Sequence, residues 1–218
     1  MNNSPGNSAR PLGAAFRVLL VLTALHPLAV TGAAQALFPH RANGSEVRSG
    51  GRVVGSELIG QRYDPPLGPG QETPAPDLKW FQPRPSNGLG TNTVNTQYKL
   101  LLSGATNRSG DNEELIAWVK EARAAVIRDN STAGHRVGPA DVPADAVTSS
   151  GSGLDPHISP RYAALQVPRV AERNGPEPRR VERLVEDHTE GRTPGFVGEP
   201  RVNVLGLNIA LRELVAGR

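Results

Sequence analysis

The chain has 218 residues, of which 37% are hydrophobic, 4% aromatic and 21% charged, and it contains no cysteine. This length suits one domain with a modest core, and the absence of cysteine excludes disulfides, thiolate metal sites and a cysteine nucleophile. The formal net charge is only +3, and the arginines are interleaved with acidic residues rather than gathered in a basic stripe. We therefore expect no nucleic-acid partner.

One long apolar stretch lies near the N-terminus. Between Arg17 and His40 the sequence has no lysine, arginine, aspartate or glutamate. As a helix, residues 16–38 would be roughly 34 Å long, against about 30 Å for the hydrocarbon core of a bilayer. We predict a transmembrane helix over residues 12–39, preceded by a disordered polar tail over residues 1–11 and followed by a soluble domain over residues 40–218.

The residues alone leave two fates open for this stretch. Arg10 and Arg17 form a basic leader, and Ala34-Gln35-Ala36 is an acceptable cleavage site, so a signal peptide could release a secreted or periplasmic binding module. Against cleavage, the apolar residues continue far beyond a typical signal core, and Pro27 would kink a membrane helix without ending it. A retained helix would make the chain a subunit of a membrane complex.

The first half of the soluble region is predicted to be short elements and loops. Residues 46–48 and 52–54 flank a Ser-Gly-Gly turn and predict a hairpin. Residues 64–77 are rich in proline and predict a loop. Residues 78–81 form either a short strand or an aromatic plug, and residues 87–110 predict an irregular excursion.

Helical signals dominate the second half. Asp111 is the predicted N-cap of a helix that ends near Asp129, because Glu113 and Glu114 follow it and apolar residues then recur at helical spacing. Ser159 followed by Pro160 predicts the start of a second helix, which ends near Asn174.

The remaining elements are predicted from shorter patterns. Residues 142–148 suggest a short strand, residues 181–188 an amphipathic helix, residues 201–205 a strand and residues 207–214 a last helix. Pro168 suggests a kink in the second helix. Because strands and helices do not alternate regularly, we predict an α+β domain, small and mixed, with irregular loops.

Ser152, Asp155 and His157 are the residues that most resemble a catalytic set. A triad needs its groups to converge, which residues this close in one extended loop generally cannot do, and the loop lacks a G-x-S-x-G elbow. The same Gly-Ser run could cradle a phosphate, but no Gly-Lys-Ser/Thr ending follows it. The histidines show no metal-ligand spacing, so we predict no metal site. We also predict no catalytic residue.

Several stretches, taken in order, resemble the C subunit of the Kdp potassium-transporting P-type ATPase, the KdpC family. The similarity runs from about Leu12 to the end of the chain. Its stretches are Leu25-His26-Pro27-Leu28, Ala42-Asn43-Gly44-Ser45, Gly55-Ser56-Glu57-Leu58-Ile59-Gly60-Gln61, Arg84-Pro85-Ser86, the run from Ser149 to Pro160, Gln166-Val167-Pro168-Arg169-Val170-Ala171 and Val202-Asn203-Val204-Leu205-Gly206-Leu207-Asn208.

The resemblance implies an accessory subunit that has no activity alone and is held in the bacterial plasma membrane by one helix. Its partners would be a potassium-channel-like subunit and a catalytic P-type ATPase subunit, and it would act as a catalytic chaperone that raises the ATP affinity of the catalytic subunit. ATP would then act through that subunit, and no cofactor would bind this chain directly.

The family motif makes one loop the candidate docking or nucleotide-related site, formed by Ser152, Gly153, Leu154, Asp155, Pro156 and Ser159. The family's complex places the soluble domain on the outer face of the membrane, whereas ATP is cytoplasmic. We therefore favour a docking or folding element over a nucleotide site.

Overall fold

The computed structural model describes residues 6–65, 75–86, 103–104 and 108–217. These residues fall into two compact units, Met1–Glu46 and Val47–Arg218, which are treated separately. Parts of the predicted proline-rich loop (66–74) and of the predicted excursion (87–102 and 105–107) lie outside the described residues.

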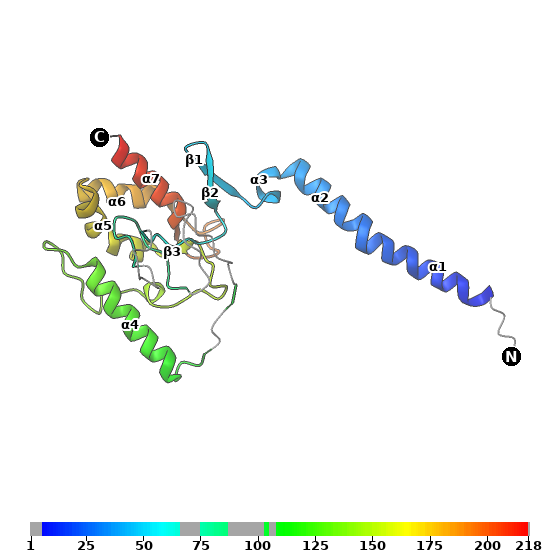
Figure 1. Cartoon of the computed structure of the whole chain (residues 1–218), viewed down its shortest axis with the longest axis horizontal. Helices are drawn as coiled ribbons and strands as arrows, with labels where there is room; N and C mark the ends of the chain where they lie inside the picture. Colours follow the sequence, from blue (N-terminus) through cyan, green and yellow to red (C-terminus); the bar gives the residue numbers. More distant parts are fainter. Residues whose placement is uncertain (1–5, 66–74, 87–102, 105–107, 218) are drawn as a thin grey trace. The chain divides into compact units, whose positions relative to one another are not determined.

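The first unit is almost entirely helical. It consists of α1 (Gly6–Leu20), a π-helical turn η1 (Val21–Leu25), α2 (His26–Leu37) and the short α3 (Pro39–Ala42), as Figure 1 shows. The stretch Pro11–Leu37 has 27 residues and is long and apolar enough to cross a membrane, since it spans about 40 Å. The helix begins at Gly6, earlier than the expected Leu12.

Pro27 explains the π-helical turn. Proline has no N–H to offer the carbonyl of Thr23, and its ring crowds that carbonyl. The preceding turn therefore widens, and the N–H of His26 bonds to the carbonyl of Val21 five residues earlier. The helix continues beyond the proline, as predicted.

The second unit is an α+β domain with very short strands, which confirms the predicted class. Its elements are β2 (Arg52–Ser56), α4 (Glu113–Asn130), the 3₁₀ turn η2 (Ala144–Ala146), β3 (His157–Ile158), α5 (Pro160–Asn174), α6 (Pro178–Asp187), β4 (Thr189–Glu190), β5 (Arg201–Asn203) and α7 (Val204–Ala216). Strand β1 (Glu46–Ser49) pairs with β2, which confirms the predicted hairpin, and Gly50 and Gly51 supply the positive φ angles of its turn.

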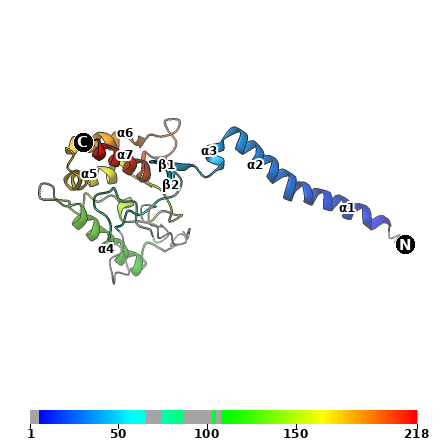
Figure 2. The same ribbon diagram turned by 45° about the horizontal axis from the view of Figure 1, so that its top comes forward.

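A second sheet has the order β3-β5-β4, with both pairs antiparallel. Its central strand places Val202 opposite both Ile158 and Thr189. Helix α5 packs against α4, α6 and β5, and α7 packs against α6 and β5 (Figure 2). The fully buried apolar side chains lie mainly on these elements, among them Ala163, Val170, Val181, Val202, Leu207 and Leu211.

Two helix starts follow side-chain caps. Helix α5 begins as predicted, because the Ser159 hydroxyl accepts the N–H of Tyr162 at 3.0 Å, and it ends at Gly175 with φ of 82°. The predicted N-cap Asp111 of α4 is wrong. Asn112 is extended (ψ 119°) and its Oδ1 accepts the N–H of Leu115 at 3.0 Å, so the cap lies one residue later.

Two strand predictions are corrected by local polar bonds. Residues 142–148 form no strand, because the backbone turns at η2 so that Asp145 can accept bonds from the N–H and hydroxyl of Ser159 at 2.7 and 2.9 Å. The strand predicted over residues 201–205 ends at Asn203, whose side chain accepts the N–H of Gly206 and starts α7.

Phe81 fills the core without belonging to a strand, so residues 78–81 form the aromatic plug. Its side chain is fully buried. The side chain of Asn208 in α7 makes the backbone hydrogen bonds that a neighbouring strand would otherwise make. The amide of Asn208 accepts the N–H of Phe81 and donates to its carbonyl, both at 2.9 Å. Gln166 of α5 likewise accepts the N–H of Gln82 at 2.7 Å and donates to its carbonyl at 3.1 Å.

Arg169 completes this side-chain network. The residue is 2% exposed. Its guanidinium donates to Asn130 Oδ1 at 2.9 Å, to Gln166 Oε1 at 2.7 Å and to the carbonyls of Leu78 and Trp80. Burial lowers the pKa of Arg169 to about 10, so the group stays charged at neutral pH. Among the described residues Arg169 forms no ion pair, and its charge is stabilised by neutral acceptors.

Replacing Asn208 with alanine should destabilise the chain by about 2–5 kcal/mol, because two buried backbone groups of Phe81 lose their partner. Urea unfolding of the full chain in detergent measures this loss. Asn174→Ala is the matched control, since that partly exposed amide also bonds to a backbone carbonyl, that of Lys79 at 2.7 Å. The control should cost about 1 kcal/mol or less. Equal losses in the two variants would contradict the role of Asn208.

Candidate functional site

The predicted site loop connects η2 to β3 and α5, and its residues differ in accessibility. Ser152 is exposed, Leu154, Asp155 and Ser159 are half-buried, and Gly153 and Pro156 are buried. Ser159 serves as the N-cap of α5 and binds Asp145. Five of the six predicted residues are consecutive in the chain and Ser159 follows two residues later, but only some of the six are exposed.

The polar side chains of the loop bind its own backbone. The hydroxyl of Ser152 accepts the N–H of Leu154 at 3.1 Å, and that of Ser150 accepts the N–H of Asp155 at 3.3 Å. Asp155 Oδ1 accepts the N–H of His157 at 2.9 Å. These bonds fix the turn from within, as Asx and serine turns do.

Asp155 also joins two other side chains. Its Oδ1 lies 3.1 Å from His157 Nδ1, and its Oδ2 lies 3.5 Å from Arg84. The hydrogen bond from His157 is the main cause that lowers the pKa of Asp155, and the charge of Arg84 acts in the same direction. Asp155 is therefore a carboxylate at neutral pH and cannot act as a general acid there.

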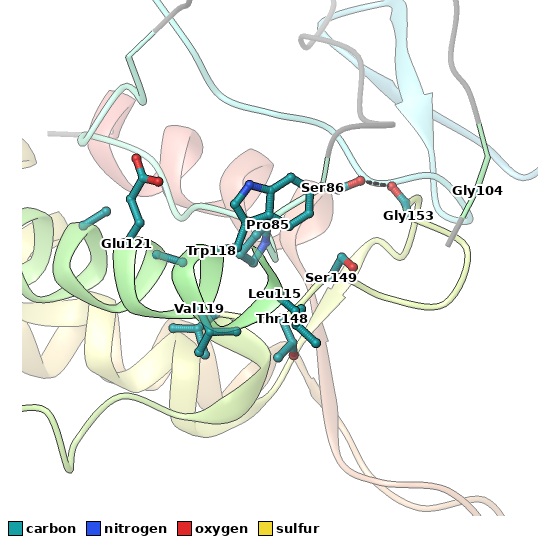
Figure 3. Close-up of a pocket in the computed structure, with 13 residues that line it drawn as sticks. Pro85, Ser86, Gly104, Leu115, Trp118, Val119, Glu121, Thr148, Ser149 and Gly153 are labelled. Carbon is teal, nitrogen blue, oxygen red and sulfur yellow. Dashed lines mark hydrogen bonds between the residues drawn. The ribbon is translucent and has the colours of Figure 1, made fainter. Parts of the chain in front are cut away.

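Distant segments converge on the loop. The guanidinium of Arg84 donates to the carbonyls of Thr148 and Ser149, and the hydroxyl of Ser86 donates to the carbonyl of Gly153 (Figure 3). The carbonyl of Ser152 accepts the N–H of Gly104 at 3.0 Å.

Two further backbone bonds tie the loop to the hairpin end and to the start of α7. They join Gly60 to Leu154 at 2.8 Å and Val204 to Pro156 at 3.0 Å. The loop is thus the point at which several parts of the domain are fastened together.

The Ser-His arrangement required for hydrolysis is not formed. Ser152 bonds within its own turn and lies 3.5 Å from Ser150 Oγ, whereas the partner of His157 is Asp155. The described residues also contain no group of three or more histidine, cysteine, aspartate or glutamate side chains that could hold a metal. Among the described residues, the loop therefore brings together neither a Ser-His pair nor a metal-binding cluster.

A groove of about 490 Å³ lies beside the loop, and the sequence patterns did not predict it. One wall is α4, which contributes Leu115, Trp118 and Val119, and the opposite wall includes Pro85 and Gly153 (Figure 3). Trp118 is 39% exposed and the guanidinium of Arg108 lies 5.3 Å from the centroid of its ring. In the sequence, the signal for this groove is the apolar pattern of α4, which includes Leu115, Trp118 and Val119.

A second cavity of about 340 Å³ is also lined by the 82–86 segment, and several charged side chains border it. Arg62 Nε lies 3.2 Å from Asp64 Oδ2, and the Asp64 side chain is 1% exposed. Desolvation raises the pKa of Asp64. Arg84 and Arg169 also line this cavity, but their donors are directed to the bonds already described.

The fold and the site together define a class of protein. A helix able to cross a membrane precedes an α+β domain whose most elaborated loop fastens segments together beside an open apolar groove. These features define an α+β domain that follows a helix able to cross a membrane and that shows no assembled catalytic set or metal cluster among its described residues.

Comparison with known proteins gives the particular family. The model of the family "KdpC: K+-transporting ATPase, c chain" matches residues 10–213. A potassium-transporting ATPase KdpC subunit of Streptomyces avermitilis is 69% identical, with 99% of each chain covered, and one of Streptomyces coelicolor is 66% identical, with 99% of this chain and 98% of the relative covered. One of Mycobacterium tuberculosis is 44% identical over 94% of this chain and 99% of the relative. The chain belongs to the KdpC family, the C subunits of the potassium-transporting ATPase.

Replacing Gly153 with alanine should lower the free energy of unfolding of the chain by about 1–3 kcal/mol, the range for strained backbone positions. Gly153 has a φ of 71°, and a Cβ there would lie 3.1 Å from the carbonyl oxygen of Gly104 and 3.3 Å from Ser86 Oγ. Thermal unfolding of the full chain in detergent measures the effect.

Gly151→Ala is the control for this variant, because a Cβ at Gly151 meets no atom within 4 Å and its φ is not positive. The control should stay within about 0.5 kcal/mol of the parent chain, as surface substitutions usually do. If both variants unfold like the parent, the loop is not the fastening point inferred from its bonds.

Proposed function

We propose that the chain is the accessory subunit of a high-affinity, ATP-driven potassium uptake complex in the bacterial plasma membrane. Membership of the KdpC family over nearly the whole chain carries the proposal. The helix Pro11–Leu37 supports retention in the membrane as a single-pass protein. In this proposal the partners are the catalytic P-type ATPase subunit and the potassium-channel-like subunit.

We further propose that the subunit acts as a catalytic chaperone, raising the ATP affinity of the catalytic subunit and stabilising the complex. The domain reaches the nucleotide only through its partners, so the effect is a coupling free energy between two sites. Such couplings are typically about 1–3 kcal/mol, or roughly 5–150-fold in affinity, and they are reciprocal.

The loop around Ser152 and Asp155 serves this role as a docking and folding element, not as a nucleotide site. Its hydroxyl groups bind its own backbone, its carboxylate is paired with His157 and Arg84, and it presents no lysine. An anionic triphosphate would meet the Asp155 carboxylate with no free cation supplied by the loop itself. The groove beside the loop offers an apolar surface of the kind that protein partners bind.

The full chain carrying an affinity tag should recover a P-type ATPase subunit and a channel-like subunit from detergent-solubilised membranes. A variant lacking residues 1–39 should recover much less of both, because it loses the membrane helix. Photoreactive ATP added to the intact complex should label the catalytic subunit and leave Ser152 and Asp155 unlabelled.

Intact-mass measurement of the recovered chain serves as the control for processing. A retained helix gives the mass of the full chain, whereas loss of about 36 residues would indicate a secreted module instead. Failure of the full chain to recover any ATPase subunit would contradict the proposed function. ATP labelling at Ser152 or Asp155 would contradict the docking role of the loop.

A further inference from the structure

Arg84 bonds to two separate parts of the candidate site loop. Its Nε donates to the carbonyl of Thr148 at 3.4 Å, and its Nη2 donates to the carbonyl of Ser149 at 3.2 Å. Its Nη1 lies 3.5 Å from Asp155 Oδ2. Each nitrogen of the planar guanidinium therefore meets a different acceptor, which the single ammonium group of a lysine could not do. Arg84 thus joins the beginning of the loop to its middle.

The backbone that carries Arg84 is held on both sides. Pro83 and Pro85 flank it, and a proline fixes its own φ and restricts the residue before it. On one side, the backbone of Gln82 exchanges two hydrogen bonds with a side chain of α5, and on the other the hydroxyl of Ser86 donates to the loop. The guanidinium therefore extends from a stiff segment, and its position can determine that of the loop.

Arg84 acts on the groove beside α4 through the groups that it bonds. The described residues that line this groove include Thr148 and Ser149 but not Arg84, which borders the second cavity instead (Figure 3). Thr148 is half-buried and Ser149 is exposed, so water can replace the Arg84 donors at their carbonyls. Loss of the guanidinium should therefore change the shape of the loop more than the stability of the domain.

We propose that Arg84 is a positioning residue, which holds the loop in the shape that couples this subunit to the ATP affinity of the catalytic subunit. This inference rests on the proposed function and deepens it, because it names the side chain on which the coupling depends. Arg84 acts through the carbonyls of Thr148 and Ser149 and through the Asp155 carboxylate, and it does not touch ATP.

Arg84→Lys tests this inference, because it keeps the positive charge and removes the planar fork. The full chain carrying the substitution is assembled with the other ATPase subunits in detergent, and ATP hydrolysis is measured over a range of ATP concentrations. The KM for ATP should rise by on the order of fivefold or more, the lower end of typical couplings. The kcat and the recovery of the complex should stay close to those of the parent, since the chemistry lies elsewhere.

Arg161→Lys is the matched control. The guanidinium of Arg161 also donates to two backbone carbonyls, those of Ala140 and Asp141, at 2.8 and 3.4 Å. These carbonyls lie outside the candidate site loop, so the control should keep the KM of the parent.

Hydrogen exchange in the full chain alone gives a second measurement that does not need ATP or partners. In Arg84→Lys the amides of Leu154 and Asp155 should exchange faster than in the parent, because the loop opens locally. The amides in the middle of α5 should exchange as in the parent, since the domain keeps its stability. A merely structural role would change both sets of amides together.

A parent-like KM in Arg84→Lys, or an equal rise of the KM in Arg161→Lys, would overturn the inference. Loss of kcat or of complex recovery with an unchanged KM would also overturn it, as would loop amides that exchange as in the parent. If the complex has the same KM with and without the parent chain, the proposed function fails, and the inference falls with it. That comparison uses no variant, so it separates failure of the proposed function from failure of the role of Arg84.

Discussion

The domain depends on side chains that substitute for a missing strand. Gln166 and Asn208 each offer one acceptor and one donor to a single residue of the 81–82 segment, as a neighbouring backbone would. Arg169 donates to two carbonyls that precede this segment, those of Leu78 and Trp80, and also to Gln166. These bonds join α5 to the segment, and the bonds of Asn208 join α7 to it. A chain with strands of only two or three residues in its main sheet needs this substitution, because buried backbone groups must be satisfied. Without it, Phe81 could not reach the core.

The same segment leads into the candidate site. Two residues of this segment bond to the loop: Arg84 donates to the carbonyl of Ser149, and Ser86 donates to the carbonyl of Gly153. Pro85 and Ser86 also line the groove beside α4. The loop from Ser152 to Ser159 is thus joined to the buried network through residues 82–86. These connected hydrogen bonds give a physical route by which binding at the groove could change the buried network, as the proposed coupling to the catalytic subunit requires.

Local patterns predicted the elements whose causes are local. The hairpin at Gly50 and Gly51 and the start of α5 at Ser159 follow from turn and cap chemistry within a few residues. The strand expected over residues 142–148 failed because Asp145 turns towards Ser159, which lies fourteen residues later. The groove and the bonds of Asn208 to Phe81 could not be predicted either, since each depends on contacts set by the whole fold. Resemblance to a family identified the loop from Ser152 to Ser159, but not that it fastens Arg84, Ser86 and Gly104.

Hydrogen exchange at the backbone amides of Phe81 and Gln82 tests the strand substitution most directly. These amides lie outside any helix or strand, yet Asn208 and Gln166 should protect them as strongly as amides in the middle of α5, so that they exchange only when the domain unfolds. Exchange as fast as that of the exposed loop residue Gly151 would show that the side chains do not hold the segment, and would contradict the account.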